Sequence, residues 1–182
     1  MAYDQYVMTM HRRQAAIDNA NKCFDEFPKY DWLSWFNGCA GESAVFSYFA
    51  DDQFGIRQGG KKLHDLELQL PSKIVRLEVK TQMRTVPAHP SYEANVDARQ
   101  VENQFPDAYV FCSAYFSPTK DTAHCQAIEV VGWITKKDLI QHARLLKKGD
   151  TFANGRDVTK DVYSLAFEAM RPMHQLKKMA TT

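Results

Sequence analysis

The chain has 182 residues, of which 45% are hydrophobic and 25% charged, and its formal net charge is +1. This length argues for one domain, and the composition is that of a soluble globular protein, which excludes disordered, collagen-like and coiled-coil chains. The longest charge-free apolar stretch, residues 108–116, is much shorter than the roughly 20 residues of a membrane-spanning helix. We expect no membrane partner, and a cytoplasmic location (the host cytoplasm for a phage-encoded chain), because no secretory signal opens the sequence.

Several motif classes are absent from the sequence. The four cysteines form no C-x-x-C pair, so zinc and iron–sulfur sites are not expected and the thiols should be reduced. Walker, G-x-G-x-x-G and G-x-S-x-G motifs are also absent, which argues against nucleotide cofactors and serine hydrolase chemistry.

The N-terminal third favours two helices. Apolar residues recur at helical spacing over residues 5–27, which predicts an amphipathic helix packed on the core. A second helix is expected over residues 39–50, introduced by Asn37-Gly38, with Glu42 in its first turn. A carboxylate in that turn is explained by the helix dipole alone, so Glu42 by itself predicts no function.

Two alternating segments then flank Pro71-Ser72. Residues 62–70 and 73–82 read as a β-hairpin, because each alternates apolar and polar side chains. Proline does not adopt the positive φ of the favoured two-residue turns, so a longer loop with a shifted register is the alternative.

A two-residue loop would place acidic side chains together. It pairs Asp65 with Glu78 and Glu67 with Arg76, while Lys80 lies one pleat beyond Glu78 on the same face. The register therefore predicts two neighbouring carboxylates beside an ammonium group.

The remaining chain alternates between the two element types. The long apolar run before residue 117 predicts a strand buried on both faces. The expected elements are helix 96–104, strand 107–116, strand 126–134, helix 135–149, strand 162–167 and helix 170–179. Together with the hairpin they predict a mixed α/β fold.

Facing carboxylates favour a bound hard cation that oxygen atoms ligate. Asp65 and Glu78 are the candidate ligands, the Val79 backbone carbonyl is a third, and Lys80 could position a water or stabilise phosphate charge. The structural alternative is an ordinary exposed hairpin whose acids and lysine form a solvated ion-pair network. Burial of this face would argue against that alternative.

The segment LEVKTQ, with Asp65 on the facing strand and Glu42 on an earlier helix, resembles the signature of the PD-(D/E)xK phosphodiesterase superfamily. The resemblance covers about residues 38–133 and implies a restriction endonuclease-like α-β-β-β-α-β core with a mixed central sheet flanked by helices. It implies that Asp65 and Glu78 bind Mg²⁺, for which Mn²⁺ substitutes. Lys80 would be the catalytic lysine, Glu42 an accessory acid that reaches the metal directly or through water, and Gln82 a residue near the substrate.

The sequence departs from that signature at one position, because His64 stands where the family name has proline. Glu67 also competes with Asp65 for the ligand role, since both lie on one face of the same strand. We favour Asp65 because Glu67 would be neutralised by Arg76 across the hairpin.

These observations predict a Mg²⁺-dependent DNA endonuclease, and the alternative is a catalytically silent nucleic-acid-binding or inhibitor protein on the same scaffold. A homodimer would suit restriction or junction cleavage, which needs two active sites. The expected organisation is an N-terminal helical extension (1–36), a nuclease core (37–134) and a C-terminal helix with a basic tail (135–182) packed on the core as one domain. The expected DNA contacts are Lys61, Lys62, Arg84, Lys136 and Lys137.

Overall fold

The computed structural model describes residues 3–28, 31–50, 55–59, 64–117 and 125–178. The strands are β1 (Asp4–Val7), β2 (Gly55–Gln58), β3 (Leu66–Gln69), β4 (Ile74–Arg84), β5 (Glu93–Asp97), β6 (Ala108–Phe116), β7 (Cys125–Thr135), β8 (Arg144–Leu146) and β9 (Val162–Ala166). The helices are α1 (Met10–Glu26), α2 (Trp32–Ala50), α3 (Ala98–Asn103), α4 (Lys136–His142) and α5 (Met173–Lys178), with a 3-10 turn at Phe167–Ala169. None of the helices in these ranges is long and apolar enough to cross a membrane.

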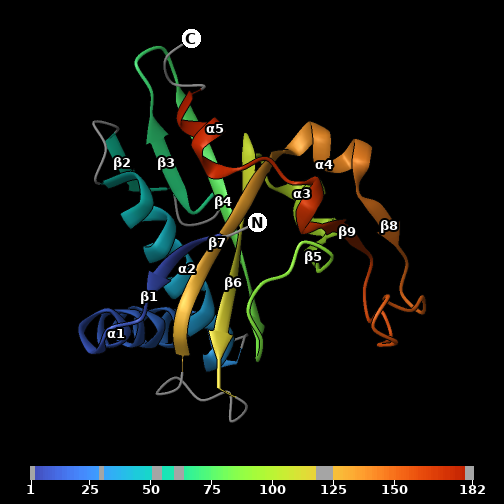
Figure 1. The fold of residues 1–182 in the computed structure, drawn as a ribbon, viewed down its shortest axis with the longest axis horizontal. Helices are drawn as coiled ribbons and strands as arrows, with labels where there is room; N and C mark the ends of the chain where they lie inside the picture. The colour runs from blue at the N-terminus through green and yellow to red at the C-terminus, as the bar shows by residue number, and fades with distance from the viewer. Residues whose placement is uncertain (1–2, 29–30, 51–54, 60–63, 118–124, 179–182) are drawn as a thin grey trace.

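A six-stranded mixed sheet forms the centre of the fold, in the order β1-β7-β6-β4-β3-β2 (Figure 1). Strands β2, β3 and β4 form an antiparallel meander, and β6 returns parallel to β4. The connection from β4 to β6 contains α3, so α2, β2, β3, β4, α3 and β6 follow one another as the expected α-β-β-β-α-β core. The mixed α/β prediction is therefore confirmed, with β5 inserted into the connection as part of a second sheet, β5-β9-β8.

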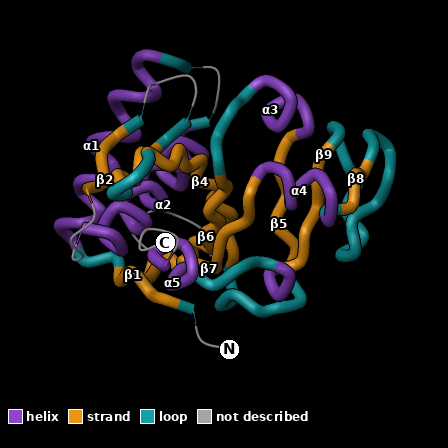
Figure 2. The backbone as a smooth tube through the Cα atoms, turned by 90° about the horizontal axis from the view of Figure 1, so that it is seen from above, coloured by secondary structure: helices purple, strands orange, loops and turns teal. Residues whose placement is uncertain are grey.

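The large sheet is covered on both faces, as Figure 2 shows: α1 and α2 lie on one side of β6 and β7, and the small sheet lies with α3 and α4 on the other. Val110 and Cys112 of β6 pack in the core on the α2 side, whereas Tyr109 and Phe111 pack in the second core. Strand β6 is therefore buried on both faces, as predicted, and this explains why its sequence is an unbroken run of apolar residues.

The hairpin has the predicted register. Glu67 pairs with Arg76 and Leu66 pairs with Leu77. The Leu70 N–H donates to the Lys73 carbonyl at 2.8 Å, which closes a loop containing only Pro71 and Ser72. The alternative of a longer loop is thus excluded.

The expected helix over residues 5–27 was wrong in its first turn. Residues 4–7 form β1, which pairs with the edge of β7, and α1 begins only after Thr9, whose side chain accepts a hydrogen bond from the Arg12 N–H. The apolar residues of this short segment have helical spacing, but its pairing with the distant strand β7 stabilises the strand conformation instead.

The second helix begins earlier than expected, at Trp32 instead of Cys39. The Asp31 carboxylate accepts from the Ser34 N–H at 2.9 Å and so caps the helix seven residues before Cys39. Glu42 consequently lies in the middle of α2, and the explanation of its charge by the helix dipole was wrong.

Two other elements are shorter than expected. The segment 96–104 divides into the end of β5 and α3, because Asp97 caps the helix through the Arg99 N–H at 3.0 Å. The helix expected over 135–149 begins where expected, with Thr135 as its cap, but it ends at His142, after which the chain forms β8. The division of the chain at residues 36 and 134 stays a prediction.

Candidate active site

The first acid of the site lies where β3 and β4 separate. Asp65 directly precedes β3, and its N–H donates to the Leu77 carbonyl at 3.0 Å, one residue out of the hairpin register. The Val79 N–H donates instead to the Asp65 side-chain Oδ2 at 2.7 Å. A carboxylate thus replaces a backbone carbonyl as the acceptor, which fixes Asp65 at the edge of β4.

Glu78 and Lys80 project from β4 on the face that also carries Tyr109 of β6. Glu78 is 3% exposed, and its Oε1 accepts a hydrogen bond from Lys80 Nζ at 2.6 Å. Its other oxygen, Oε2, is buried without a hydrogen-bond partner among the described residues. A solvated surface network does not describe a carboxylate in this position.

Glu42 of α2 lies close enough to the same acids for their charges to act on it. The helix lies close to β4, since a Cβ on Gly41 would collide with the Thr81 side chain. Burial, together with the charges of Asp65 and Glu78, raises the pKa of Glu42 to about 8, against the opposing effect of Lys80. Among the described residues, these three acids therefore share one electrostatic environment with Lys80.

The pKa of Asp65 is raised as well. Burial and the charge of Glu78 raise its pKa to about 6, although Lys80, the Val79 N–H and His64 act in the opposite sense. Desolvation and like charges both penalise ionised carboxylates, so a positive charge placed between them would be stabilising.

The donor set fits a magnesium ion. Mg²⁺ prefers oxygen ligands and is commonly held by one or two carboxylates together with water and substrate phosphates. The unpaired Oε2 of Glu78 and the raised pKa values of Asp65 and Glu42 are the features expected of such a site. Within the described ranges, no group of three or more His, Cys, Asp or Glu side chains is placed so that it could hold a metal ion, so any site here has fewer than three such side-chain ligands.

The Val79 carbonyl, the third predicted ligand, faces the same side as its N–H. In a paired strand the N–H and C=O of one residue point toward the same neighbour, and the Val79 N–H points toward Asp65. The carbonyl therefore lies on the Asp65 side of β4.

Glu67, the competing ligand, is already neutralised. Its carboxylate accepts from Arg57 Nε at 2.6 Å and contacts His64 Nε2 at 2.9 Å, and these hydrogen bonds lower its pKa. Arg76 lies opposite Glu67 as expected, but it forms its ion pair with Asp107 at 3.2 Å. The neutralisation of Glu67 by Arg76 was therefore wrong, because Arg57 on the neighbouring strand β2 takes that role. These ion pairs favour Asp65 as the ligand.

Gln82 and Arg84 continue along β4 from Lys80. Gln82 Oε1 accepts from Arg84 at 2.9 Å, and the same guanidinium donates to the Glu93 carbonyl and lies 4.6 Å from the centre of the Tyr92 ring. Arg84 is therefore held by the protein itself, and its expected contact with DNA stays a prediction.

The other expected DNA contacts have different surroundings. Lys61 and Lys62 lie outside the described residues. Lys136 donates to the Gln104 carbonyl at 2.7 Å and lies over the Phe105 ring, whereas Lys137 is exposed. Their roles, like those of the predicted ligands, stay predictions.

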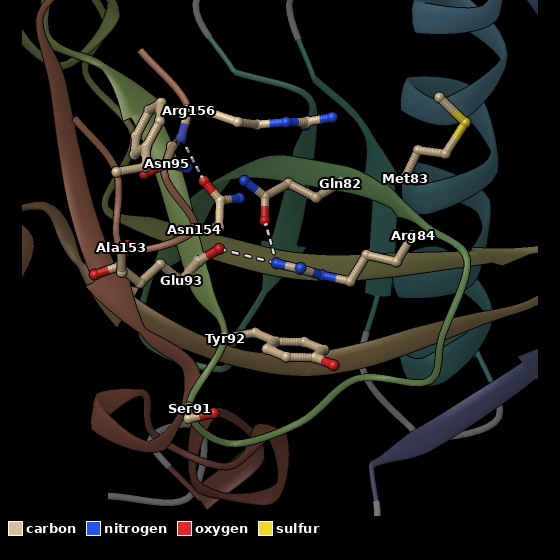
Figure 3. Close-up of a pocket in the computed structure, with 11 residues that line it drawn as sticks. Gln82, Met83, Arg84, Ser91, Tyr92, Glu93, Asn95, Ala153, Asn154 and Arg156 are labelled. Atoms are coloured by element: carbon tan, nitrogen blue, oxygen red, sulfur yellow. Dashed lines mark hydrogen bonds between the residues drawn. The ribbon is translucent and has the colours of Figure 1, made fainter. Parts of the chain in front are cut away.

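A pocket that the sequence did not reveal adjoins the end of β4 (Figure 3). Its volume is about 480 Å³, and its far wall includes Asn154 and Arg156 from a turn between β8 and β9. The dipeptide Asn154-Gly155, in which Gly155 has a φ of 80°, is the signal that could have identified this turn.

Comparisons with known proteins do not assign the chain to a family. No protein-family model matches the chain, and no curated protein matches it. Among solved structures, a bacterial homing endonuclease is similar, with a TM-score of 0.43 and 13% sequence identity over 80% of this chain and 92% of that one. This likeness is too low to carry an argument, so the function is argued from the site.

Proposed function

We propose that the protein is a divalent-metal-dependent DNA endonuclease, with Asp65, Glu78 and the Val79 carbonyl as ligands of Mg²⁺ or Mn²⁺. The observation that carries the proposal is the cluster of buried Glu78 with half-buried Asp65 and Glu42 beside Lys80, in which Glu78 Oε2 has no partner among the described residues. Acids that are withdrawn from water and close to one another are costly for stability and are frequent at functional sites.

In this proposal the acids hold the metal ion and the lysine acts on the water or the phosphate. Asp65 and Glu78 supply oxygen ligands from two adjacent strands, and Glu42 supplies a further carboxylate from α2. A bound divalent ion would lower the pKa of a water molecule and offset charge on the phosphate. Lys80, 2.6 Å from Glu78, supplies a cation that orients the attacking water or contacts a phosphate oxygen.

A plasmid-nicking assay tests this function. We expect wild-type protein to nick supercoiled DNA with Mg²⁺ or Mn²⁺ but not with EDTA, and Lys80→Ala and Asp65→Asn to reduce the rate at least about a hundredfold. Matched controls are Lys73→Ala and Asp25→Asn, which change exposed residues of the hairpin loop and α1 and should leave nicking unchanged. Nicking that persists in EDTA, or survives both site variants, would refute the proposal.

The alternative is a catalytically silent DNA-binding protein. Two observations favour this alternative: the ion pair between Lys80 and Glu78, and the absence, in the described part of the chain, of three acid, histidine or cysteine side chains that could hold a metal ion. It predicts gel shifts that persist in EDTA and survive Lys80→Ala with only a modest, salt-dependent loss, together with no metal-dependent nicking.

A further inference from the structure

The pocket at the end of β4 lies beside the proposed catalytic site on the same face of the sheet. Lys80, Gln82 and Arg84 alternate along β4 and therefore point to one side, and the last two line the pocket. Strand β5 and the turn between β8 and β9 form the other walls. A substrate strand that contacts Lys80 would thus meet this pocket next.

Arg84 orients the wall that β4 contributes. Its guanidinium donates to Gln82 Oε1 and to the Glu93 carbonyl, and it lies over the rings of Tyr92 and Phe167. Because the amide oxygen of Gln82 is held in this way, its amide nitrogen is directed to the pocket, as Figure 3 shows.

The opposite walls present two more amides. Asn95 on β5 has a buried Oδ1 without a hydrogen-bond partner in the described ranges. Asn154 uses its Oδ1 to accept the Arg156 N–H at 3.2 Å, which leaves its amide nitrogen as a donor at the tip of the turn. Gln82, Asn95 and Asn154 all line this one pocket (Figure 3).

This lining matches a nucleobase better than a phosphate. Phosphate contacts come mainly from arginine and lysine, whereas amide side chains read the donors and acceptors at base edges. Of the two arginines of the pocket, Arg84 is engaged within the protein, which leaves Arg156 on the exposed turn as the cation for a backbone contact.

We propose that the pocket binds an unpaired nucleobase of the substrate strand, next to the bond that is cleaved. The base must be unpaired because a concave pocket walled by three segments of the chain admits a base only after it has left the helical stack. This inference rests on the proposed nuclease function and specifies the form of its substrate.

The test measures binding without cleavage, in EDTA and on the Lys80→Ala background. Fluorescence anisotropy compares an oligonucleotide of about 12 nucleotides with an abasic strand of the same length, which keeps the phosphates and lacks the bases. We expect the intact single strand to bind about tenfold more tightly than the abasic strand. The same difference is expected between the intact single strand and the duplex of the same sequence.

Asn154→Asp is the diagnostic variant, because it keeps the oxygen that accepts the Arg156 N–H and removes the amide donor. It should abolish most of the preference for bases, whereas Asn103→Asp, with the same charge change on the exposed end of α3, should keep it. Equal affinity for intact and abasic strands, or an unchanged preference in Asn154→Asp, would overturn the inference. Either result leaves the nicking assay to decide the nuclease function separately.

Discussion

The Val79 N–H donates to Asp65 Oδ2 at 2.7 Å, so a side chain of the proposed metal site also completes the edge of β4. Asp65 therefore has a structural role and a chemical role, and substitutions can separate them.

Asparagine and alanine at position 65 should differ in stability but not in activity. Asp65→Asn keeps an oxygen for the Val79 N–H and removes a charge close to Glu78, whereas Asp65→Ala leaves the N–H without its acceptor. We expect the alanine variant to be less stable than the asparagine variant by about 1–3 kcal/mol, with nicking lost in both. Urea unfolding measures the difference, and equal stabilities would show that the hydrogen bond is not needed for the fold.

Glu67 should be dispensable for cleavage. It is held by Arg57 and His64 and is not available as a ligand. We expect Glu67→Gln to keep the nicking rate within about threefold of wild type and to lose less than about 1 kcal/mol of stability. A loss of nicking as large as that of Asp65→Asn would assign the ligand role to Glu67 instead.

Stability of the metal-free protein should fall as the pH rises. The pKa of Glu42 is raised from 4.5 to about 8 in the folded protein, so its protonated form stabilises the fold. That contribution is fully present below about pH 4.5 and is lost as the pH rises through 8. Asp65, raised from 3.8 to about 6, acts in the same direction over a lower range.

Thermal unfolding in EDTA between pH 5 and pH 9 measures this effect. We expect Tm to fall by on the order of 5 °C more in wild type than in Glu42→Gln. Identical pH profiles for the two proteins would contradict the assigned burial of Glu42.

Divalent metal should stabilise the protein most at alkaline pH. A ligand that binds only the folded state raises Tm, and carboxylates must be ionised to bind it. Mg²⁺ or Mn²⁺ should therefore raise Tm more at pH 8.5 than at pH 5, and Glu78→Gln should remove the increase. The same increase in Glu78→Gln would place the metal elsewhere.

Two glycines of α2 should respond in opposite ways to alanine. A Cβ on Gly41 would collide with Thr81, whereas a Cβ on Gly38 would meet no atom within 4 Å. We expect Gly41→Ala to cost about 1–3 kcal/mol of stability and Gly38→Ala to gain up to about 1 kcal/mol. Thr81→Ala should rescue part of the loss in Gly41→Ala, and equal effects at the two glycines would contradict the close approach of α2 to β4.

The local part of the site could be predicted from the sequence. Alternation around Pro71-Ser72 was sufficient to give the hairpin register as far as the Leu66–Leu77 pair, because a two-residue loop fixes these cross-strand pairs. The predicted pairing of Asp65 with Glu78 does not continue this register, because the Asp65 N–H bonds to the Leu77 carbonyl. The partner of Glu67 could not be found in this way, since Arg57 belongs to a strand beyond a connection whose pairing leaves no local pattern. For the same reason β1 was expected as helix, although it pairs with β7 more than a hundred residues away.

The pocket proposed to bind a base could not be predicted from the sequence, because residues 152–156 join its walls from far along the chain, whereas residues 82–84 and 91–95 show no local pattern of a pocket. Gln82, Asn95 and Asn154 are individually unremarkable polar residues. Only the pairing of β5 with β9 brings the last two segments to the end of β4.

The walls of the pocket that face β4 all come from outside the α-β-β-β-α-β core: β5 is an insertion in one connection, and the turn carrying Asn154 follows the last core strand. The proposed recognition of a base and the proposed cleavage of the bond would thereby be encoded in separable stretches of the polypeptide. Under these proposals, grafting a different turn between β8 and β9 would change the preferred base while Asp65, which precedes β3, and Glu78 on β4 stay untouched.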